Sequence, residues 1–176
     1  MKECILILFC SLIISCKTNT PLFNYIKISG NENSSILIIE DKIPPKILEQ
    51  NLKYKLNLDS INNIENELKK HYQEIVLECK QDSINEKWEK ENFIDLKKII
   101  IIKSDNIFNE KNMLIKNGNR LFYSFSKLYY SKNKNLVSFY VSRSDGWNSI
   151  FFGVITMKKI KNSWKLVDKI ESTELN

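Results

Sequence analysis

The chain has 176 residues, enough for one domain of ordinary size. Hydrophobic residues make up 43% of it and charged residues 27%, which excludes wholesale disorder, a collagen-like repeat and a multi-pass membrane protein. The formal net charge is +6, the basic residues are almost all lysine, and alanine is absent. Lysine, asparagine and isoleucine have AT-rich codons, so this bias indicates a low-GC bacterial genome and explains part of the lysine excess.

The chain begins with an uninterrupted apolar run from Cys4 to Ile14. As a helix this run would span roughly 16 Å, about half of a hydrocarbon core, so it is too short for a comfortable transmembrane helix. Its length is that of the hydrophobic region of a signal peptide, and the sequence turns polar directly after Cys16. The N-terminus therefore predicts export.

The residues Leu12-Ile13-Ile14-Ser15-Cys16 resemble the lipobox of bacterial lipoproteins. The resemblance implies that residues 1–15 are a signal peptide and that Cys16 becomes the lipidated N-terminus, carrying a diacylglyceryl group and an acyl chain such as palmitate. Two or three acyl chains make a stable anchor, because each buried methylene contributes about 0.8 kcal/mol. Lys17, in place of an acidic residue, favours the outer membrane. A plain secretory peptide, or a buried N-terminal strand, is the alternative.

The four cysteines are not expected to form a disulfide. Cys4 and Cys10 would leave with the signal peptide and Cys16 would be lipidated, so Cys79 would be the one thiol that remains. The fold must then rest on its hydrophobic core. A lone cysteine of this kind is usually a small buried apolar side chain, and we expect this of Cys79.

Residues 16–35 read as the lipidated cysteine and a polar tether, in which Phe23 to Ile28 could form a first strand. Residues 36–176 are expected to form a single α+β domain that opens with a short strand at 36–39. Apolar residues spaced by three and four predict a helix from about Ser60 to Cys79, and a shorter helix is expected from Ser83 to about Asn92.

The second half of the chain is rich in strand signals. The β-branched run at 99–102 suits a strand buried on both faces. Further strands with short turns between them are predicted over residues 113–115, 121–130, 136–143, 149–160 and 164–171. We expect a curved antiparallel meander of about four to six strands, with the N-terminal helices packed on it.

From about Lys97 onward the chain resembles a group of small exported or lipid-anchored bacterial proteins to which no activity is assigned. The resemblance is carried by four segments: Ser124-Phe125-Ser126-Lys127, Leu136 to Val141, Gly146 to Gly153 and Lys158 to Val167. Members of the group often carry paired cysteines around the glycine-containing turn, which here reads Asp145-Gly146-Trp147-Asn148. The resemblance thus implies attachment to a membrane but lends no thiol-based role and no reaction.

The sequence offers little for catalysis or metal binding, and we predict no catalytic residue, cofactor or metal. His71 is the one histidine, expected partly exposed on its helix, and no metal-binding spacing of cysteine and histidine occurs. The four glycines are scattered, which excludes a phosphate-binding loop. Carboxylates that could be paired for a glycosidase-like mechanism (Glu40, Asp41, Asp95, Asp145) are expected to be solvated surface acids.

Trp147 follows Asp145-Gly146 in a turn, where a large aromatic side chain is often exposed and able to bind a sugar, a peptide or a lipid headgroup. Arg143 borders the same loop, so we predict a contact patch of Arg143, Asp145 and Trp147; packing into the core is the alternative for Trp147. The lysines are dispersed, and an exported protein meets no nucleic acid. The positive charge better suits anionic lipid headgroups or acidic glycans.

These observations predict a cell-envelope lipoprotein that binds or scaffolds another envelope protein or a glycan at the membrane surface, without catalysis. The alternative is a small enzyme or ligand-binding module with a pocket between the sheet and the helix at 60–80, as in NTF2-like domains. A lipoprotein that neutralises a toxin from neighbouring cells fits the size and the location alone.

Overall fold

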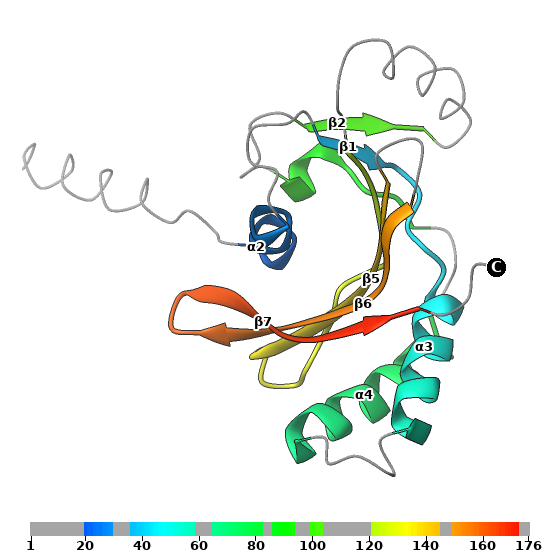
Figure 1. Cartoon of the computed structure of the whole chain (residues 1–176), viewed down its shortest axis with the longest axis vertical. Helices are drawn as coiled ribbons and strands as arrows, with labels where there is room; N and C mark the ends of the chain where they lie inside the picture. Colours follow the sequence, from blue (N-terminus) through cyan, green and yellow to red (C-terminus); the bar gives the residue numbers. More distant parts are fainter. Residues whose placement is uncertain are drawn as a thin grey trace, which may run out of the picture.

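The computed structural model describes residues 20–29, 36–58, 65–82, 86–93, 99–103, 121–144 and 149–172. They form an α+β fold around one seven-stranded sheet of order β2-β1-β3-β5-β6-β7, with β4 paired to β5. The strands are β1 (Ile36–Ile39), β2 (Ile99–Ile102), β3 (Leu121–Phe125), β4 (Tyr129–Tyr130), β5 (Leu136–Ser144), β6 (Ser149–Ile160) and β7 (Ser163–Glu171). The helices are α2 (Pro21–Ile28), α3 (Pro45–Leu58), α4 (Asn66–Cys79) and the 3₁₀ helix η1 (Lys90–Phe93). The sheet curves around α2, and α3 and α4 lie on its other face (Figure 1).

The sheet is mixed, because β1 lies between β2 and β3 and runs parallel to both. The expected antiparallel arrangement holds for β3, β5, β6 and β7, and for β4 against β5. Leu37 and Ile38 point to opposite faces of β1 and are both fully buried, and a strand that is apolar on both faces suits a central place in a sheet. The helices do not all come first, since β1 precedes α3 and α4.

The segment expected as a first strand within the tether is instead helix α2. The hydroxyl of Thr20 accepts a hydrogen bond from the Phe23 N–H at 3.2 Å. Pro21 lies in the first turn, where backbone N–H groups have no acceptor within the helix, so proline costs no hydrogen bond there. Leu22 and Ile26, four residues apart, are 1% exposed. The folded domain therefore includes α2, and the stretch available as a tether ends by Thr20.

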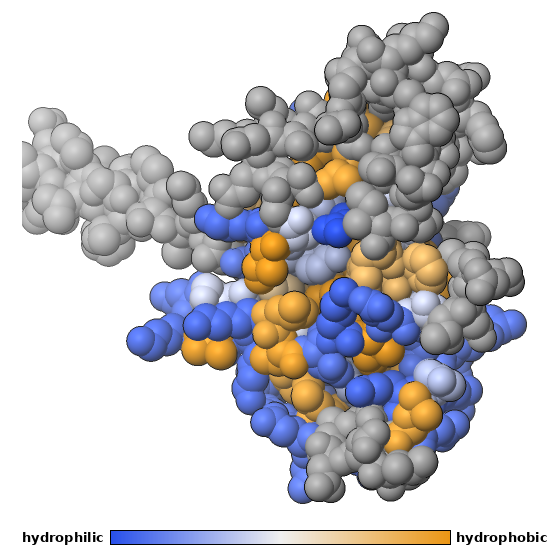
Figure 2. Space-filling view, in the orientation of Figure 1, coloured by the Kyte–Doolittle hydropathy of each residue, from blue (hydrophilic) through white to orange (hydrophobic). Residues whose placement is uncertain are grey.

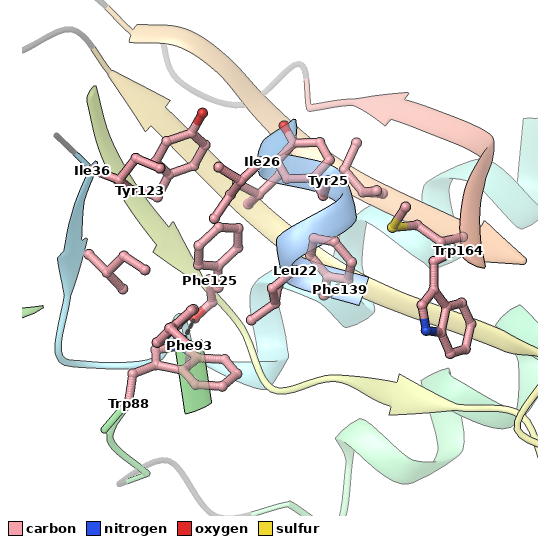
Figure 3. Close-up of a cluster of buried hydrophobic side chains, with 14 of the residues drawn as sticks. Leu22, Tyr25, Ile26, Ile36, Trp88, Phe93, Tyr123, Phe125, Phe139 and Trp164 are labelled. Carbon is pink, nitrogen blue, oxygen red and sulfur yellow. Dashed lines mark hydrogen bonds between the residues drawn. The ribbon is translucent and has the colours of Figure 1, made fainter. Parts of the chain in front are cut away.

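Tyr25 of α2 lies in the aromatic core on the concave face of the sheet (Figure 3). Its ring meets the rings of Tyr123, Phe125 and Phe139 edge-on, with centroid separations of 6.5, 6.4 and 5.7 Å. Edge-to-face pairs add to the free energy gained from burying the rings. These contacts fix α2 against the middle of the sheet.

The α3–α4 pair covers the convex face. The sequence analysis does not predict α3, which begins at Pro45; proline is tolerated in the first turn of a helix. Leu48 and Leu52 of α3 are fully buried against α4 and the sheet. The predicted helix ending at Cys79 is α4, but it begins at Asn66 and not at about Ser60, because Glu65 has a non-helical backbone and forms its N-cap. Residues 59–64 lie outside the described part.

No helix spans the described part of residues 83–92, where the chain is extended until the four-residue η1. The backbone N–H of Trp88 donates to the Glu40 carbonyl at 2.7 Å, and its indole N–H donates to the Phe125 carbonyl at 3.1 Å. These tertiary hydrogen bonds outweigh the local preference for a helix.

The strand at 99–102 was expected to be buried on both faces, and this expectation is wrong. It is β2, which lies at the edge of the sheet, and Ile100 is 45% exposed.

The last three predicted strands correspond to β5, β6 and β7 with bounds that differ by at most one residue. The strand predicted over 121–130 is divided into β3 and β4. The ladder of β3 with β5 ends at Phe125, and the next residue, Ser126, donates its N–H to the Tyr140 carbonyl at 2.9 Å and accepts from the Tyr140 N–H through its hydroxyl at 2.8 Å. The predicted strand at 113–115 and the turn after it lie outside the described residues.

Candidate functional site

A chain of polar side chains crosses the sheet beneath α4. His71 Nε2 lies 3.1 Å from Ser138 Oγ, which lies 2.8 Å from Thr156 Oγ1. Thr156 Oγ1 lies 3.0 Å from the hydroxyl of Tyr72, and that hydroxyl donates to Asp168 Oδ2 at 2.7 Å. Ser138 and Thr156 are fully buried, so each depends on these partners for its hydrogen bonds.

The strand register brings the members of this chain together. Ser138 of β5 is paired with Thr156 of β6, which is paired in turn with Asp168 of β7. Directly paired residues share one face of the sheet, so the three polar side chains form a row across it. The consecutive residues His71 and Tyr72 of α4 complete the row from above.

The direction of hydrogen bonding along the row is fixed at its Asp168 end. An ionised carboxylate only accepts, so the single hydroxyl hydrogen of Tyr72 points to Asp168. The hydrogen of Thr156 must then point to Tyr72, and that of Ser138 to Thr156. Ser138 is left as the acceptor from His71, which assigns the proton of the ring to Nε2 and leaves Nδ1 as an acceptor.

His71 is neutral in this environment. It is 2% exposed, and burial lowers the pKa of its imidazole to about 4, although the carboxylates of Glu74 and Glu67 oppose this shift. The expectation of a partly exposed surface histidine is therefore wrong. Nδ1 is buried and has no hydrogen-bond partner among the described residues, and an unsatisfied buried acceptor costs free energy.

A pocket of about 200 Å³ lies beside His71, between α4 and the turn that joins β4 to β5. It is lined by charged and polar side chains and one leucine: Glu67, Lys70, His71, Glu74, Ser131, Lys132, Asn133, Asn135 and Leu136. It does not lie between α4 and the sheet, where the alternative NTF2-like interpretation expected it. That interface is occupied by the polar row and by apolar side chains around Leu52, Tyr72 and Tyr140.

Opposite charges face one another at the rim of the pocket. Glu67 accepts from Lys158 Nζ at 2.6 Å and from the Asn135 amide at 3.0 Å, and these hydrogen bonds lower the pKa of its carboxyl. Glu74 lies 3.8 Å from Lys132 Nζ, whose side chain is 90% exposed. Exposed ion pairs of this kind stabilise a fold only weakly.

A second polar cluster ties the C-terminal end of α4 to β4. Asp82 accepts from Tyr129 at 2.9 Å and from Lys127 Nζ at 3.0 Å through both carboxylate oxygens. Cys79 is buried next to this cluster, and burial raises the pKa of its thiol to about 11. The prediction that Cys79 is a small buried side chain is confirmed.

Arg143, a member of the predicted contact patch, is directed toward the C-terminal end of α2. Its Nη1 donates to the Ser29 carbonyl at 3.4 Å, while the Ser29 hydroxyl lies 2.8 Å from the hydroxyl of Tyr123. Asp145 and Trp147 lie outside the described residues, so the patch stays a prediction.

Cys16 also lies outside the described residues, and its lipidation stays a prediction. Within the part of the chain that the structure describes, no helix is long and apolar enough to cross a membrane. In that same part, no three side chains of His, Cys, Asp or Glu are grouped so that they could hold a metal ion.

Comparison of this chain with protein-family models, with curated proteins and with solved structures finds no match.

Proposed function

We propose that this protein is a lipoprotein of the bacterial cell envelope, and that its domain acts by binding and not by catalysis. The observation that carries the proposal is the run Leu12-Ile13-Ile14-Ser15-Cys16, which ends an apolar segment of signal-peptide length. Export, removal of residues 1–15 and lipidation of Cys16 follow from it. The resemblance of the C-terminal half to exported or lipid-anchored proteins supports attachment to a membrane, and Lys17 supports the outer membrane.

The chemistry of the two best candidate reactive groups supports binding. A general base needs a pKa near the working pH, and that of His71 is about 4. A nucleophilic cysteine needs a lowered pKa and access to substrate, whereas Cys79 is buried and its thiol has a pKa of about 11. At neutral pH the His71 imidazole is therefore only a weak base, and the buried Cys79 thiol stays protonated, which argues against general-base or nucleophilic catalysis by these two groups. We propose another envelope protein or a glycan as the partner.

The anchor is tested by replacing Cys16 with serine and following the protein in its own host. Cys16→Ser should abolish labelling by a palmitate analogue and release the protein from the membrane fraction. Cys10→Ser, which changes a cysteine within the signal peptide, is the matched control and should leave both unchanged. Palmitate labelling that persists in Cys16→Ser would refute the anchor.

A small ligand-binding module is the second candidate function, and the unpartnered Nδ1 of His71 beside the pocket favours it. A ligand that donates a hydrogen bond to Nδ1 would shift the ¹⁵N resonance of that atom in an NMR titration. Since His71 is the one histidine of the chain, the signal needs no assignment by mutation. A resonance that stays constant through a panel of envelope sugars and peptides would count against this candidate.

A further inference from the structure

The β6–β7 hairpin carries exposed lysines and exposed apolar side chains together. Ile160, Leu166 and Val167 are 41%, 40% and 39% exposed, and the lysines beside them are exposed as well. We define the hairpin surface by these six residues: Lys159, Ile160, Lys161, Lys165, Leu166 and Val167. The register places Lys159 and Leu166 on the α2 side of the sheet and Lys165 on the side of Lys158, so this surface is the tip and free edge of the hairpin and not one face of the sheet. Figure 2 shows apolar residues on the face of the molecule that carries α2 and β7, with hydrophilic residues around them.

The charge of this surface is of one sign. No acidic residue occurs between Lys158 and Val167, and Lys158 is itself paired with Glu67 of α4. β7 is the last strand of the sheet, and an exposed edge strand with apolar side chains tends to pair with or be covered by something else. A surface with negative charge outside and an apolar layer beneath it would complement both the lysines and the exposed apolar side chains of the hairpin.

The hairpin also lies close to the point where the chain would leave a membrane. α2 packs against β7, and Leu22 of α2 shares a core cluster with Trp164 of β7. Thr20, at the start of α2, is four residues from Cys16. Four residues span at most about 14 Å. Acyl chains on Cys16 would therefore hold this side of the domain close to the lipid headgroups.

We infer that the hairpin surface lies on the anionic surface of the membrane to which the protein is anchored. The lysines face the phosphates of the headgroups, and Ile160, Leu166 and Val167 enter the boundary between headgroups and acyl chains, as in other peripheral membrane surfaces. The inference rests on the proposed anchor at Cys16.

The experiment uses the chain from residue 16 onward with Cys16→Ser, so that it carries neither a signal peptide nor acyl chains. Binding is measured by co-sedimentation with vesicles of phosphatidylethanolamine and phosphatidylglycerol, and with vesicles of phosphatidylcholine alone. We expect binding to the anionic vesicles only, and weakening as salt is raised. The triple variant Lys159→Glu/Lys161→Glu/Lys165→Glu should lower the partition coefficient by roughly tenfold or more.

The matched control is Lys46→Glu/Lys69→Glu/Lys80→Glu, which makes the same change of charge at exposed lysines of the α3–α4 layer. It should change the partition coefficient by no more than about twofold to threefold, through net charge alone. Equal losses in both variants would refute a specific surface. Absence of binding by the parent chain would also refute the inference. The proposed anchor is tested separately, by palmitate labelling of Cys16, so the two proposals can fail independently.

A second measurement does not depend on charge reversal. Ile160→Cys introduces an accessible thiol, and an environment-sensitive dye attached there should shift to the blue on anionic vesicles, while Cys79 stays unlabelled because it is buried. The same dye attached through Leu77→Cys, at an exposed apolar position of α4, should not shift. If the chain instead dimerises in solution and Leu166→Lys abolishes the dimer, the hairpin surface is a protein interface and the membrane assignment is wrong.

Discussion

Ser138 and Thr156 lie opposite each other on β5 and β6, with their hydroxyl oxygens 2.8 Å apart and both side chains fully buried. Each is the middle member of the row that joins Asp168 to His71. Since neither hydroxyl can reach water, the removal of one leaves buried partners without a hydrogen bond.

We therefore expect Ser138→Ala to lower the free energy of unfolding by about 1–3 kcal/mol, because the Nε2–H of His71 loses its acceptor. Ser142→Ala, at a partly exposed position of the same strand and face, is the control and should change it by less than about 0.5 kcal/mol. Urea denaturation measures both. The double variant Ser138→Ala/Thr156→Ala should be less destabilised than the sum of the single variants, and additive losses would show that the two hydroxyls act independently.

Stability should fall in acid because of His71. Its pKa is about 4 in the folded protein and about 6.5 when unfolded, so the unfolded chain binds a proton first as the pH falls. Above pH 6.5 the neutral His71 makes its full contribution to the free energy of unfolding, and about 3 kcal/mol of that contribution is lost between pH 6.5 and pH 4. His71→Gln, which keeps a donor for Ser138, should remove this slope when unfolding is measured across that range. A histidine resonance that titrates near pH 6.5 in the folded protein would contradict the assignment.

The strands of the C-terminal half could be predicted because their information is local. Alternating apolar residues and short polar turns fix β5, β6 and β7, and a residue such as Phe139 needs no distant partner to indicate a strand. Mixed topology could not be predicted in this way. The parallel pairing of Ile38 with Ile101 and Tyr123 depends on segments far apart in the chain, and no local pattern encodes it.

The polar row was missed for a related reason. Ser138 and Thr156 are single polar residues inside apolar strands, which is a visible signal, but only the register shows that they face each other. His71 was expected near the surface because the helix pattern alone does not show that it packs on the sheet and bonds to Ser138 of a distant strand. The helix α2 is a different case: Thr20 followed by Pro21 is a local helix-start signal, and it was outweighed by the β-branched and aromatic residues that follow.

The membership of α2 in the domain can be tested by truncating its buried face. Leu22 is 1% exposed in the concave core, so Leu22→Ala should lower the free energy of unfolding by about 2–5 kcal/mol. Ile28→Ala, on the same helix but 53% exposed, should cost less than about 0.5 kcal/mol. Chemical denaturation of both variants decides the point. Similar small losses would indicate that α2 is a loosely held part of a tether.

Gly153 allows β6 and β7 to approach closely. Its φ is +157°, and a Cβ at this position would lie 2.0 Å from the backbone oxygen of Ile170, which a side-chain rotation cannot relieve. Gly153→Ala should therefore cost more than about 2 kcal/mol, as expected for a steric clash with backbone. Lys159→Ala, exposed on the same strand, is the control and should be nearly neutral. A stable Gly153→Ala variant would show that the β6–β7 ladder can shift at this point.

The state of the cysteines links the fold to the proposed anchor. If the signal peptide is removed and Cys16 is lipidated, the mature protein has Cys79 as its one free thiol. At pH 8 a thiol reagent should react slowly with the folded protein, because Cys79 is buried and its pKa is about 11, and rapidly once guanidinium unfolds it. Unfolded mature protein should then release one equivalent of chromophore, and the Cys16→Ser variant also one if its signal peptide is cut. Two equivalents from the mature parent protein would show that Cys16 carries no thioether. Rapid reaction of Cys79 in the folded, cleaved Cys16→Ser variant would show that the interface of α4 with the sheet opens far more readily than its packing suggests.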